Sequence, residues 1–213
     1  PACDFAPVEG RDLPRVPSVL FEGVGFAIAR TGDGDQEKYL LLDHGPFRSH
    51  GHRDKLNFNL FALGQELFAD AGSAWYSTDV YQRYYSQTLA HNTVSYDGQN
   101  QIPASGRLEA YGQRGLLAVI RADTDSAIPS TILDRTLLLA GDRLYDLMHL
   151  RSGIPFTFDL PYHSHGEVSA DVEAEPWADH PADALGWAYY KDPNIASVDN
   201  GWRATWTVPR GKV

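Results

Sequence analysis

Residues 56–63 read Leu-Asn-Phe-Asn-Leu-Phe-Ala-Leu, and this stretch decides the fold class. Apolar side chains occupy every second position from Leu56 to Ala62, and Asn57 and Asn59 fall between them. Successive side chains of a strand point to opposite faces, so the pattern predicts a strand with one apolar face and one polar, uncharged face. We expect the asparagine face to line a wet groove.

Similar short patterns, separated by turn signals, recur along the whole chain. Gly64-Gln65 predicts a two-residue hairpin turn, and Gly141-Asp142 and Asn200-Gly201 are further hairpin signals. Residues 76–89 are the one stretch that we expect to be mostly irregular or helical. We expect strands at residues 19–30, 38–43, 56–63, 66–70, 93–96, 116–122, 132–140, 143–151, 156–160, 186–190, 195–198 and 202–208. This pattern predicts an all-β fold, a large antiparallel β-sandwich of two packed multi-stranded sheets.

The composition fits a single aromatic-rich β domain. The 213 residues are 43% hydrophobic and include 11 Tyr, 9 Phe and 5 Trp, which excludes a disordered chain and favours strands. All-β domains commonly reach this length without splitting. Residues 1–18 carry four prolines and predict a linker or a strap along the surface, which leaves 19–213 as the sandwich domain.

Charge and cysteine content exclude several classes of protein. The net charge of -10 argues against non-specific nucleic-acid binding, although a local basic cleft can still take an anion. Cys3 is the only cysteine, so no internal disulfide or thiolate metal cluster can form. No apolar run approaches the length of a membrane span, and no signal peptide is recognisable. Because the chain starts at Pro1 and its only methionine is Met148, we expect it to come from a longer polypeptide with a preceding domain.

Several histidines and carboxylates between residues 44 and 97 can carry chemistry. His50 and His52 are one residue apart, so an extended backbone would project both imidazoles from the same side. A set of two histidines and one aspartate, completed by water, is a common zinc site. Alternatives stay open for each residue. The histidine pair can be a surface loop, Asp70 can belong to a simple turn, and His91 can be a polar residue that precedes a strand.

Four segments of this region carry a family resemblance. They are His50-Gly51-His52-x-Asp54-x-Leu56-x-Phe58, Gly64-Gln65-Glu66-Leu67-Phe68-Ala69-Asp70-x-Gly72, Tyr84-Tyr85, and Ala90-His91-Asn92-Thr93-Val94 with Asp97-Gly98-Gln99. The combination resembles the heparinase II/III-like family of polysaccharide lyases, and residues 160–168 are similar to a second, looser family segment. The resemblance implies an enzyme in which an N-terminal (α/α) toroid packs on a C-terminal antiparallel β-sandwich, with the active site between them. This chain would be the sandwich, without the toroid.

The resemblance also implies roles for individual residues. It makes His52, Asp70 and His91 the ligands of a zinc ion that is mainly structural. It makes His50 the catalytic histidine that faces the substrate, and it places Tyr84-Tyr85 near the site as further catalytic candidates. The principal catalytic tyrosine of the family generally belongs to the toroid.

The predicted hairpin sets a condition on this zinc site. If Gly64-Gln65 is a simple turn, Asp70 pairs with Asn59, and a straight strand would place His52 roughly 23 Å from Asp70. The zinc assignment therefore requires residues 50–55 to fold back over the sheet as a loop.

Lyases of this family cleave the bond at C4 of a uronic acid by β-elimination. The reaction needs neutralisation of the carboxylate, a base for the C5 proton and an acid for the leaving oxygen, and histidine and tyrosine can supply these. Arg53, Arg83 and Arg48 are candidates for binding substrate carboxylates or sulfates through the guanidinium fork, and His163 is a candidate substrate contact. Solvated surface charge is the alternative for the arginines.

We therefore expect the C-terminal domain of a lyase that acts on an acidic, uronate-containing polysaccharide or oligosaccharide. We expect the isolated domain to be inactive, and the parent enzyme to be bacterial and periplasmic or secreted, with the cytoplasm as an open alternative. Two other functions stay open at this point. One is a non-catalytic carbohydrate-binding or structural sandwich with a stabilising metal, and the other is a cupin-like metal enzyme that uses a two-histidine, one-carboxylate set directly.

Overall fold

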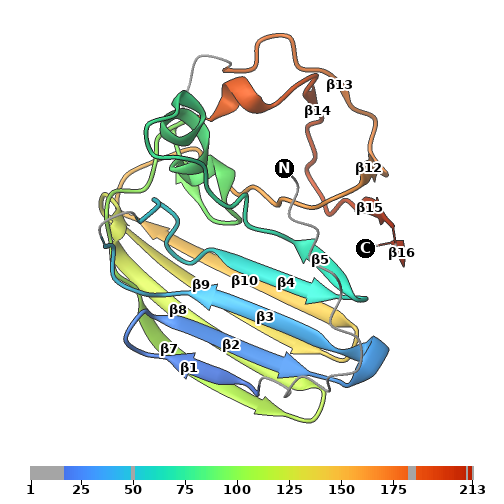
Figure 1. The fold of residues 1–213 in the computed structure, drawn as a ribbon. Coiled ribbons are helices and arrows are strands. Elements are labelled where there is room, and N and C mark those ends of the chain that lie inside the picture. The colour runs from blue at the N-terminus through green and yellow to red at the C-terminus, as the bar shows by residue number, and fades with distance from the viewer. Residues whose placement is uncertain (1–16, 49–50, 182–185, 210, 213) are drawn as a thin grey trace.

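The structure is a computed structural model that describes residues 17–48, 51–181, 186–209 and 211–212. Two antiparallel sheets form a β-sandwich (Figure 1). The five-stranded sheet has the order β1 (Val19–Phe21), β2 (Phe26–Thr31), β3 (Lys38–Asp43), β4 (Phe58–Ala62) and β5 (Gln65–Phe68). The four-stranded sheet has the order β10 (Arg143–Ser152), β9 (Thr131–Ala140), β8 (Leu117–Ile128) and β7 (Arg107–Arg114).

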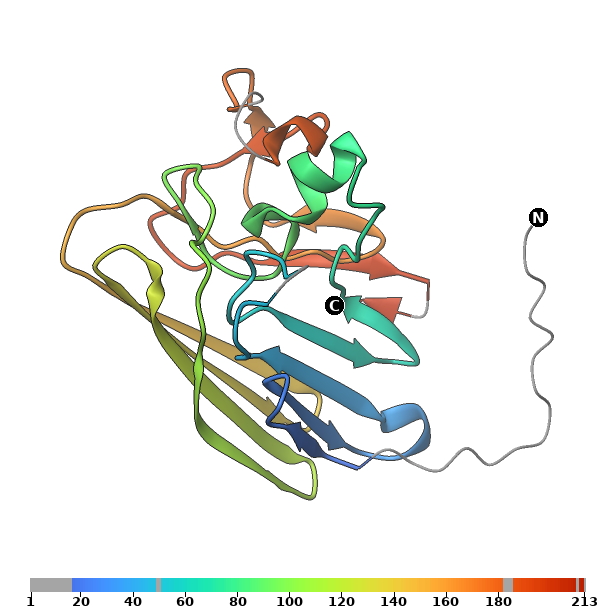
Figure 2. The ribbon, with the colours of Figure 1, turned by 60° about the vertical axis from the view of Figure 1, so that its left-hand side comes forward.

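Shorter elements lie beyond β5, along one edge of the sandwich (Figures 1 and 2). The helical turns are η1 (Gly34–Gln36), in the β2–β3 connection, and η2 (Tyr81–Tyr85), η3 (Thr88–Ala90) and η4 (Trp187–Tyr189) in this outer part. The paired short strands are β6 (Ser95–Tyr96) with β11 (Phe158–Asp159), β13 (Glu175–Pro176) with β14 (Asn194–Ile195), and β15 (Ala204–Val208) between β12 (Glu167–Ala170) and β16 (Gly211–Lys212). No helix in the described ranges is long and apolar enough to cross a membrane.

One apolar core joins the two sheets. The alternating residues of β4 and the turn before it face inward and are buried, as the sequence pattern predicted, and Leu40 and Leu42 of β3 lie beside them. Ile120 and Leu137, which pair across β8 and β9, belong to the same core from the opposite sheet. Burial of each such side chain contributes about 1.5–3 kcal/mol, so alternation in these strands is enough to drive the sheets together.

The hairpin between β4 and β5 turns one residue earlier than predicted. Leu63 and Gly64 both adopt left-handed backbone angles, with φ of 54° and 69°, and Ala62 pairs with Gln65. The prediction of a Gly64-Gln65 turn is therefore wrong. Positive φ at both central positions matches the right-handed twist of the flanking strands, and glycine lowers its cost at the second position.

Several other strand and turn predictions are wrong. Residues 19–30, predicted as one strand, form the hairpin of β1 and β2. Residues 186–190 form the helical turn η4, because Gly186 has a φ of 88° and the following aromatic residues pack against one another instead of on a sheet. Asn200-Gly201 closes no hairpin, since β14 pairs with β13 and β15 pairs with β12 and β16. The strand β7 was missed because its side chains are mostly exposed and polar. Residues 1–16 of the predicted linker lie outside the described residues.

Candidate functional site

The β4–β5 hairpin brings three polar segments together at its open end. Because the hairpin is antiparallel, the residues that precede β4 lie beside the residues that follow β5. Asn57, just before β4, donates from Nδ2 to Oδ2 of Asp70, just after β5, at 2.7 Å. The main-chain amide of Asn92, in the segment that leads into β6, donates to Oδ1 of Asn57 at 2.9 Å. The Asp70 carboxylate thus contacts Asn57, and the pairing of Leu60 with Phe68 does not place Asp70 opposite Asn59.

Residues 51–57 fold back as a loop over this end of the hairpin, which is the condition that the zinc hypothesis set. The rings of His52 and His91 are 5.0 Å apart between centroids, and the ring of Tyr81 is 5.7 Å from that of His52. The bend into β4 passes through Leu56, which is fully buried and has a left-handed φ of 63°. A branched side chain in this conformation costs free energy, so the surrounding structure must hold it there.

Buried polar side chains hold the loop by its main chain. Gln101 accepts from the amide of Lys55 at 2.7 Å and donates to the carbonyl of the same residue at 3.1 Å. The hydroxyl of Thr93 also donates to the Lys55 carbonyl, at 2.6 Å, and Thr88 donates to the Arg53 carbonyl at 2.6 Å. Buried polar groups are costly when they lack partners, so these bonds favour one loop conformation over the others.

Arg135 connects the second sheet to the same loop. This arginine of β9 is fully buried and forms a bidentate ion pair with Asp146 of β10, at 2.9 and 2.5 Å. Its Nη1 donates to the carbonyls of Leu56, at 2.8 Å, and Asn92, at 2.5 Å, and its guanidinium lies 4.5 Å from the centre of the Phe58 ring. The planar, fork-shaped guanidinium suits this set of acceptors in a way that lysine could not.

His91 has hydrogen-bond acceptors at both ring nitrogens. Its Nδ1 lies 2.7 Å from Oδ2 of Asp70, and its Nε2 lies 3.0 Å from the carbonyl oxygen of Tyr85. Neither partner can donate, so both nitrogens must carry a proton unless a cation takes the place of one proton. Burial opposes charge on His91, but the Asp70 hydrogen bond and charge outweigh it and raise the pKa of His91. For Asp70, burial is likewise outweighed by His91, and the pKa of Asp70 is lowered.

The residues around His91 fit a metal ion. His52, Asp54 and His91 each place one ligand atom within 4.8 Å of the other two. In a tetrahedral zinc site the ligand atoms are about 3.3 Å apart, so these atoms would have to come closer by up to about 1.5 Å to share one ion. Burial, followed by the charge of His91, lowers the pKa of His52 and favours the neutral imidazole that binds metals. His52 and His91, two of the three predicted ligands, therefore lie together with Asp54. Asp70 contacts Nδ1 of His91 but is not one of the three residues that share this distance.

The other predicted site residues lie around this cluster. His50 lies outside the described residues. Tyr84-Tyr85 belong to η2, and burial raises the pKa of Tyr84. Arg53 is exposed, and Arg83 is exposed with Asp79 at 3.8 Å. His163 is half-buried, with Nε2 2.9 Å from the carbonyl oxygen of Leu89.

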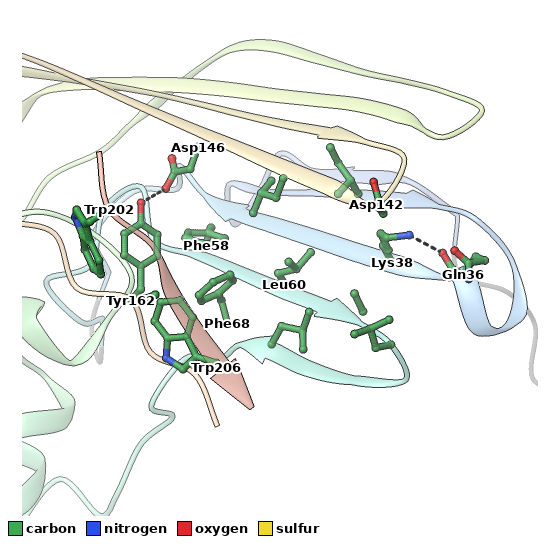
Figure 3. Close-up of a pocket in the computed structure, with 16 residues that line it drawn as sticks. Gln36, Lys38, Phe58, Leu60, Phe68, Asp142, Asp146, Tyr162, Trp202 and Trp206 are labelled. Carbon is green, nitrogen blue, oxygen red and sulfur yellow. Dashed lines mark hydrogen bonds between the residues drawn. The ribbon is translucent and has the colours of Figure 1, made fainter. Parts of the chain in front are cut away.

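Two cavities differ in their relation to the cluster. The smaller, of about 340 Å³, is lined by His52 and Asp54 together with Arg48. The larger, of about 690 Å³, lies between β4, β5, β10 and β15 and shares no lining residue with the cluster (Figure 3). The smaller cavity is the candidate site, because the larger one is lined mainly by aliphatic and aromatic side chains and by no histidine.

Sequence reasoning missed the framework of the site. Asn57 is buried between Asp70 and Asn92, so the expectation that it lines a wet groove is wrong. Asn92 donates to the carbonyls of Phe58 and Ala69, both at 3.0 Å, and accepts from the amide of His163 at 2.6 Å. Arg135 could have been recognised in the sequence, because it is a charged residue next to the apolar run of β9. Nothing in the sequence around Gln101 indicates its role.

Comparison with known sequences decides the family. Residues 13–211 match the family described as "Heparinase II/III-like, C-terminal". The chain belongs to this family. It is 26% identical over 204 residues to an alginate lyase of Stenotrophomonas maltophilia (strain K279a), covering 88% of the chain and 27% of that enzyme. It is 26% identical over 137 residues to a heparin-sulfate lyase of Pedobacter heparinus, covering 62% of the chain and 21% of that enzyme. The chain thus spans about a quarter of the length of these curated relatives.

Solved structures agree with the observed fold. A heparinase III gene product superposes with a TM-score of 0.64 at 22% identity, over 74% of this chain and 26% of that one. A mutant of the heparan sulfate lyase of Pedobacter heparinus superposes with a TM-score of 0.53 at 26% identity, over 60% of this chain and 21% of that one. The β-sandwich predicted from the alternating strands is therefore confirmed, and the chain is a domain of a polysaccharide lyase family.

Proposed function

We propose that the chain is the C-terminal domain of an enzyme that cleaves an acidic, uronate-containing polysaccharide or oligosaccharide by β-elimination. The observation that carries the proposal is the family match across residues 13–211, together with the lyase names of both curated relatives. In this proposal an N-terminal (α/α) toroid completes the active site, and the parent enzyme is a bacterial protein of the periplasm or the extracellular space.

The proposed chemistry divides the reaction among side chains at the loop and at η2. His50 would face the substrate and neutralise its carboxylate or take the C5 proton. Tyr84-Tyr85 would move a proton to the leaving oxygen, and the raised pKa of Tyr84, caused mainly by burial, keeps that phenol protonated and able to donate. Arg48 lines the cavity beside His52, where it can bind a uronate carboxylate. Arg53, Arg83 and His163 are the further proposed substrate contacts.

A zinc ion held by His52, Asp70 and His91 would have a structural role. When bound, it would add metal–ligand bonds that fix the loop of residues 51–57 against the end of β5. Donation from Nε2 of His91 to the Tyr85 carbonyl would orient the imidazole, as such hydrogen bonds commonly do for histidine ligands. The same bond links the ligand to the tyrosine-bearing turn η2.

The test uses the full-length parent enzyme with alginate and with heparan sulfate as two uronate substrates. We expect unsaturated uronate products from at least one polymer, and a loss of at least about 100-fold in rate for His50→Ala. His149→Ala, an exposed histidine of β10, is the matched control and should keep the parent rate. Absence of unsaturated products from uronate polymers would contradict the proposed function, and an unchanged rate in His50→Ala would contradict only the role of His50.

The larger cavity favours carbohydrate binding as a second function. Trp202 and Tyr162 are 56% and 37% exposed, and with Trp206 they stand at one end of the groove, while Lys38 lies at the other end (Figure 3). Exposed aromatic faces can pack against sugar rings. The Tyr162 hydroxyl donates to Asp146 at 2.7 Å, which fixes the orientation of this ring. Titration with a uronate oligosaccharide should show weaker binding for Trp202→Ala than for the parent protein, and equal binding would remove this second function.

A further inference from the structure

The larger cavity is apolar along most of its length. Its walls come from aliphatic and aromatic side chains of both sheets, among them Phe58, Leu60, Ala62, Leu67, Leu139 and Leu144. β4 follows the cavity from Phe58 to Ala62, and four residue steps of a strand span roughly 13 Å. A ligand that fills this length must have an apolar body, because hydroxyl groups buried there would lose their hydrogen bonds to water.

A buried lysine lies at the end of this cavity that is far from Trp202 (Figure 3). Lys38, the first residue of β3, is only 8% exposed, and its ammonium donates to the Gln36 carbonyl at 3.2 Å. Among the residues that the structure describes, this is its one hydrogen bond, and it forms no ion pair, not even with the exposed Asp142 at the same end. An ammonium has three protons to donate, so two of them lack an acceptor.

The strand position next to Lys38 also lacks an acceptor. Thr31 of β2 pairs with Lys38 across the sheet, and both residues belong to the buried face of their strands. The Thr31 hydroxyl is buried and has no hydrogen-bond partner within the described ranges. Withdrawing a charge from water without a counter-ion is costly. This corner of the sandwich therefore favours an anion, although the net charge of the protein is -10.

We propose that the larger cavity binds an amphiphilic carboxylate, with the carboxylate on Lys38 and the apolar chain between the sheets along β4. The carboxylate supplies the acceptors that the ammonium lacks, and the chain gains hydrophobic contacts with the leucine walls. The volume of about 690 Å³ is typical of a small-molecule site. This inference does not rest on the proposed lyase function. It also differs from sugar binding at the exposed aromatic end, because the ligand here fills the apolar interior.

Calorimetric titration of the protein with decanoate, octanoate and 1-decanol tests this inference. We expect decanoate to bind about 15-fold more tightly than octanoate, because each buried CH₂ group contributes about fourfold in affinity. Decanoate should also bind at least about tenfold more tightly than 1-decanol, which has no charge. Lys38→Met should lose this preference for the carboxylate but bind 1-decanol as wild type does, which also shows that the variant folds. Lys191→Met, at an exposed lysine, is the matched control and should keep the preference.

A second variant locates the ligand in the cavity. Leu144 of β10 lines the cavity, so the larger indole of Leu144→Trp should weaken the binding of both decanoate and 1-decanol at least about tenfold. No binding of decanoate by the wild-type protein, an unchanged preference in Lys38→Met, or unchanged binding in Leu144→Trp would each overturn the inference. Displacement of bound decanoate by a uronate oligosaccharide would overturn it as well, because the cavity interior would then take a sugar.

Discussion

The interior between the two sheets and the end of the β4–β5 hairpin are both buried, but they are built from opposite chemistry. Between the sheets, side chains such as Leu40, Ile120 and Leu137 form one apolar core, and apolar contacts have no preferred direction. At the hairpin end, Asn92 and Arg135 are equally buried, and their donors each meet an oxygen atom. We call this second region, made of Asn57, Asn92, Gln101 and Arg135 with the segments that they bind, the polar network.

The two regions have different roles: the apolar core makes the sheets pack, and the polar network positions the candidate site. Hydrophobic burial scales with area and tolerates many arrangements of similar volume, so the core fixes that the sheets pack. Buried hydrogen bonds have strict geometry, and an orphaned partner is costly, so the polar network fixes where residues 51–57 lie. The histidines are positioned by the second region and not by the first.

The largest expected effect is that of Arg135→Met. Removing the guanidinium takes the donor from the buried carbonyls of Leu56 and Asn92, and it leaves the half-buried Asp146 with the Tyr162 hydroxyl as donor. Breaking a buried ion pair in this way costs about 3–5 kcal/mol. Chemical denaturation measures this loss, and hydrogen exchange at the amides of residues 55–57 should accelerate.

Arg121→Met is the matched control for this prediction. Arg121 lies on the adjacent strand β8 and pairs with Asp134, but its side chain is 48% exposed, so its loss should cost no more than about 1 kcal/mol. Equal costs for the two variants would show that the polar network does not depend on its buried arginine, and the contrast between the two regions would fail.

Leu137→Ala tests the apolar region by itself. The side chain is fully buried opposite Ile120, and truncation of a buried leucine costs about 3 kcal/mol, within the usual range. We expect the free energy of unfolding to fall. Hydrogen exchange at the amides of residues 55–57 should accelerate no more than the loss of global stability requires. Leu138→Ala, on the half-buried face of the same strand, should cost less. Selective loosening of the loop in Leu137→Ala would mean that the two regions are not separable.

The smallest effect concerns pH and His163. Burial lowers the pKa of His163 below its usual value near 6.5, so the unfolded chain takes up a proton at a higher pH than the folded protein does. Stability should therefore fall as the pH drops below about 6.5, and this part of the loss should be absent in His163→Gln, whose amide can still donate to the Leu89 carbonyl. Denaturation of both proteins at pH 7.5 and 5.5 checks this. Identical pH slopes would show that His163 does not contribute.

The sequence pattern predicted much of the fold but less of the candidate site. Residues 38–43 were predicted as a strand and form one with the same bounds, because their alternation needs no partner to be recognised. The β4–β5 turn was misplaced by one residue, since Leu63 and Gly64 share the turn and a leucine gives no local signal for positive φ. Residues 186–190 resemble a strand in composition, but Trp187 packs against Tyr190 and Trp177 instead of on a sheet.

Sequence alone determined the fold class and the family, because alternation and local motifs are properties of neighbouring residues. The metal ligands His52, Asp70 and His91 stay a prediction. The tertiary structure decided that residues 51–57 fold back, that Asp70 accepts a hydrogen bond from Asn57, and that Asp54 lies beside His52 and His91. These facts depend on Gln101 and Arg135, which lie at least 46 and 79 positions away from the loop residues that they bind. Contacts over such separations exist only once the chain has folded.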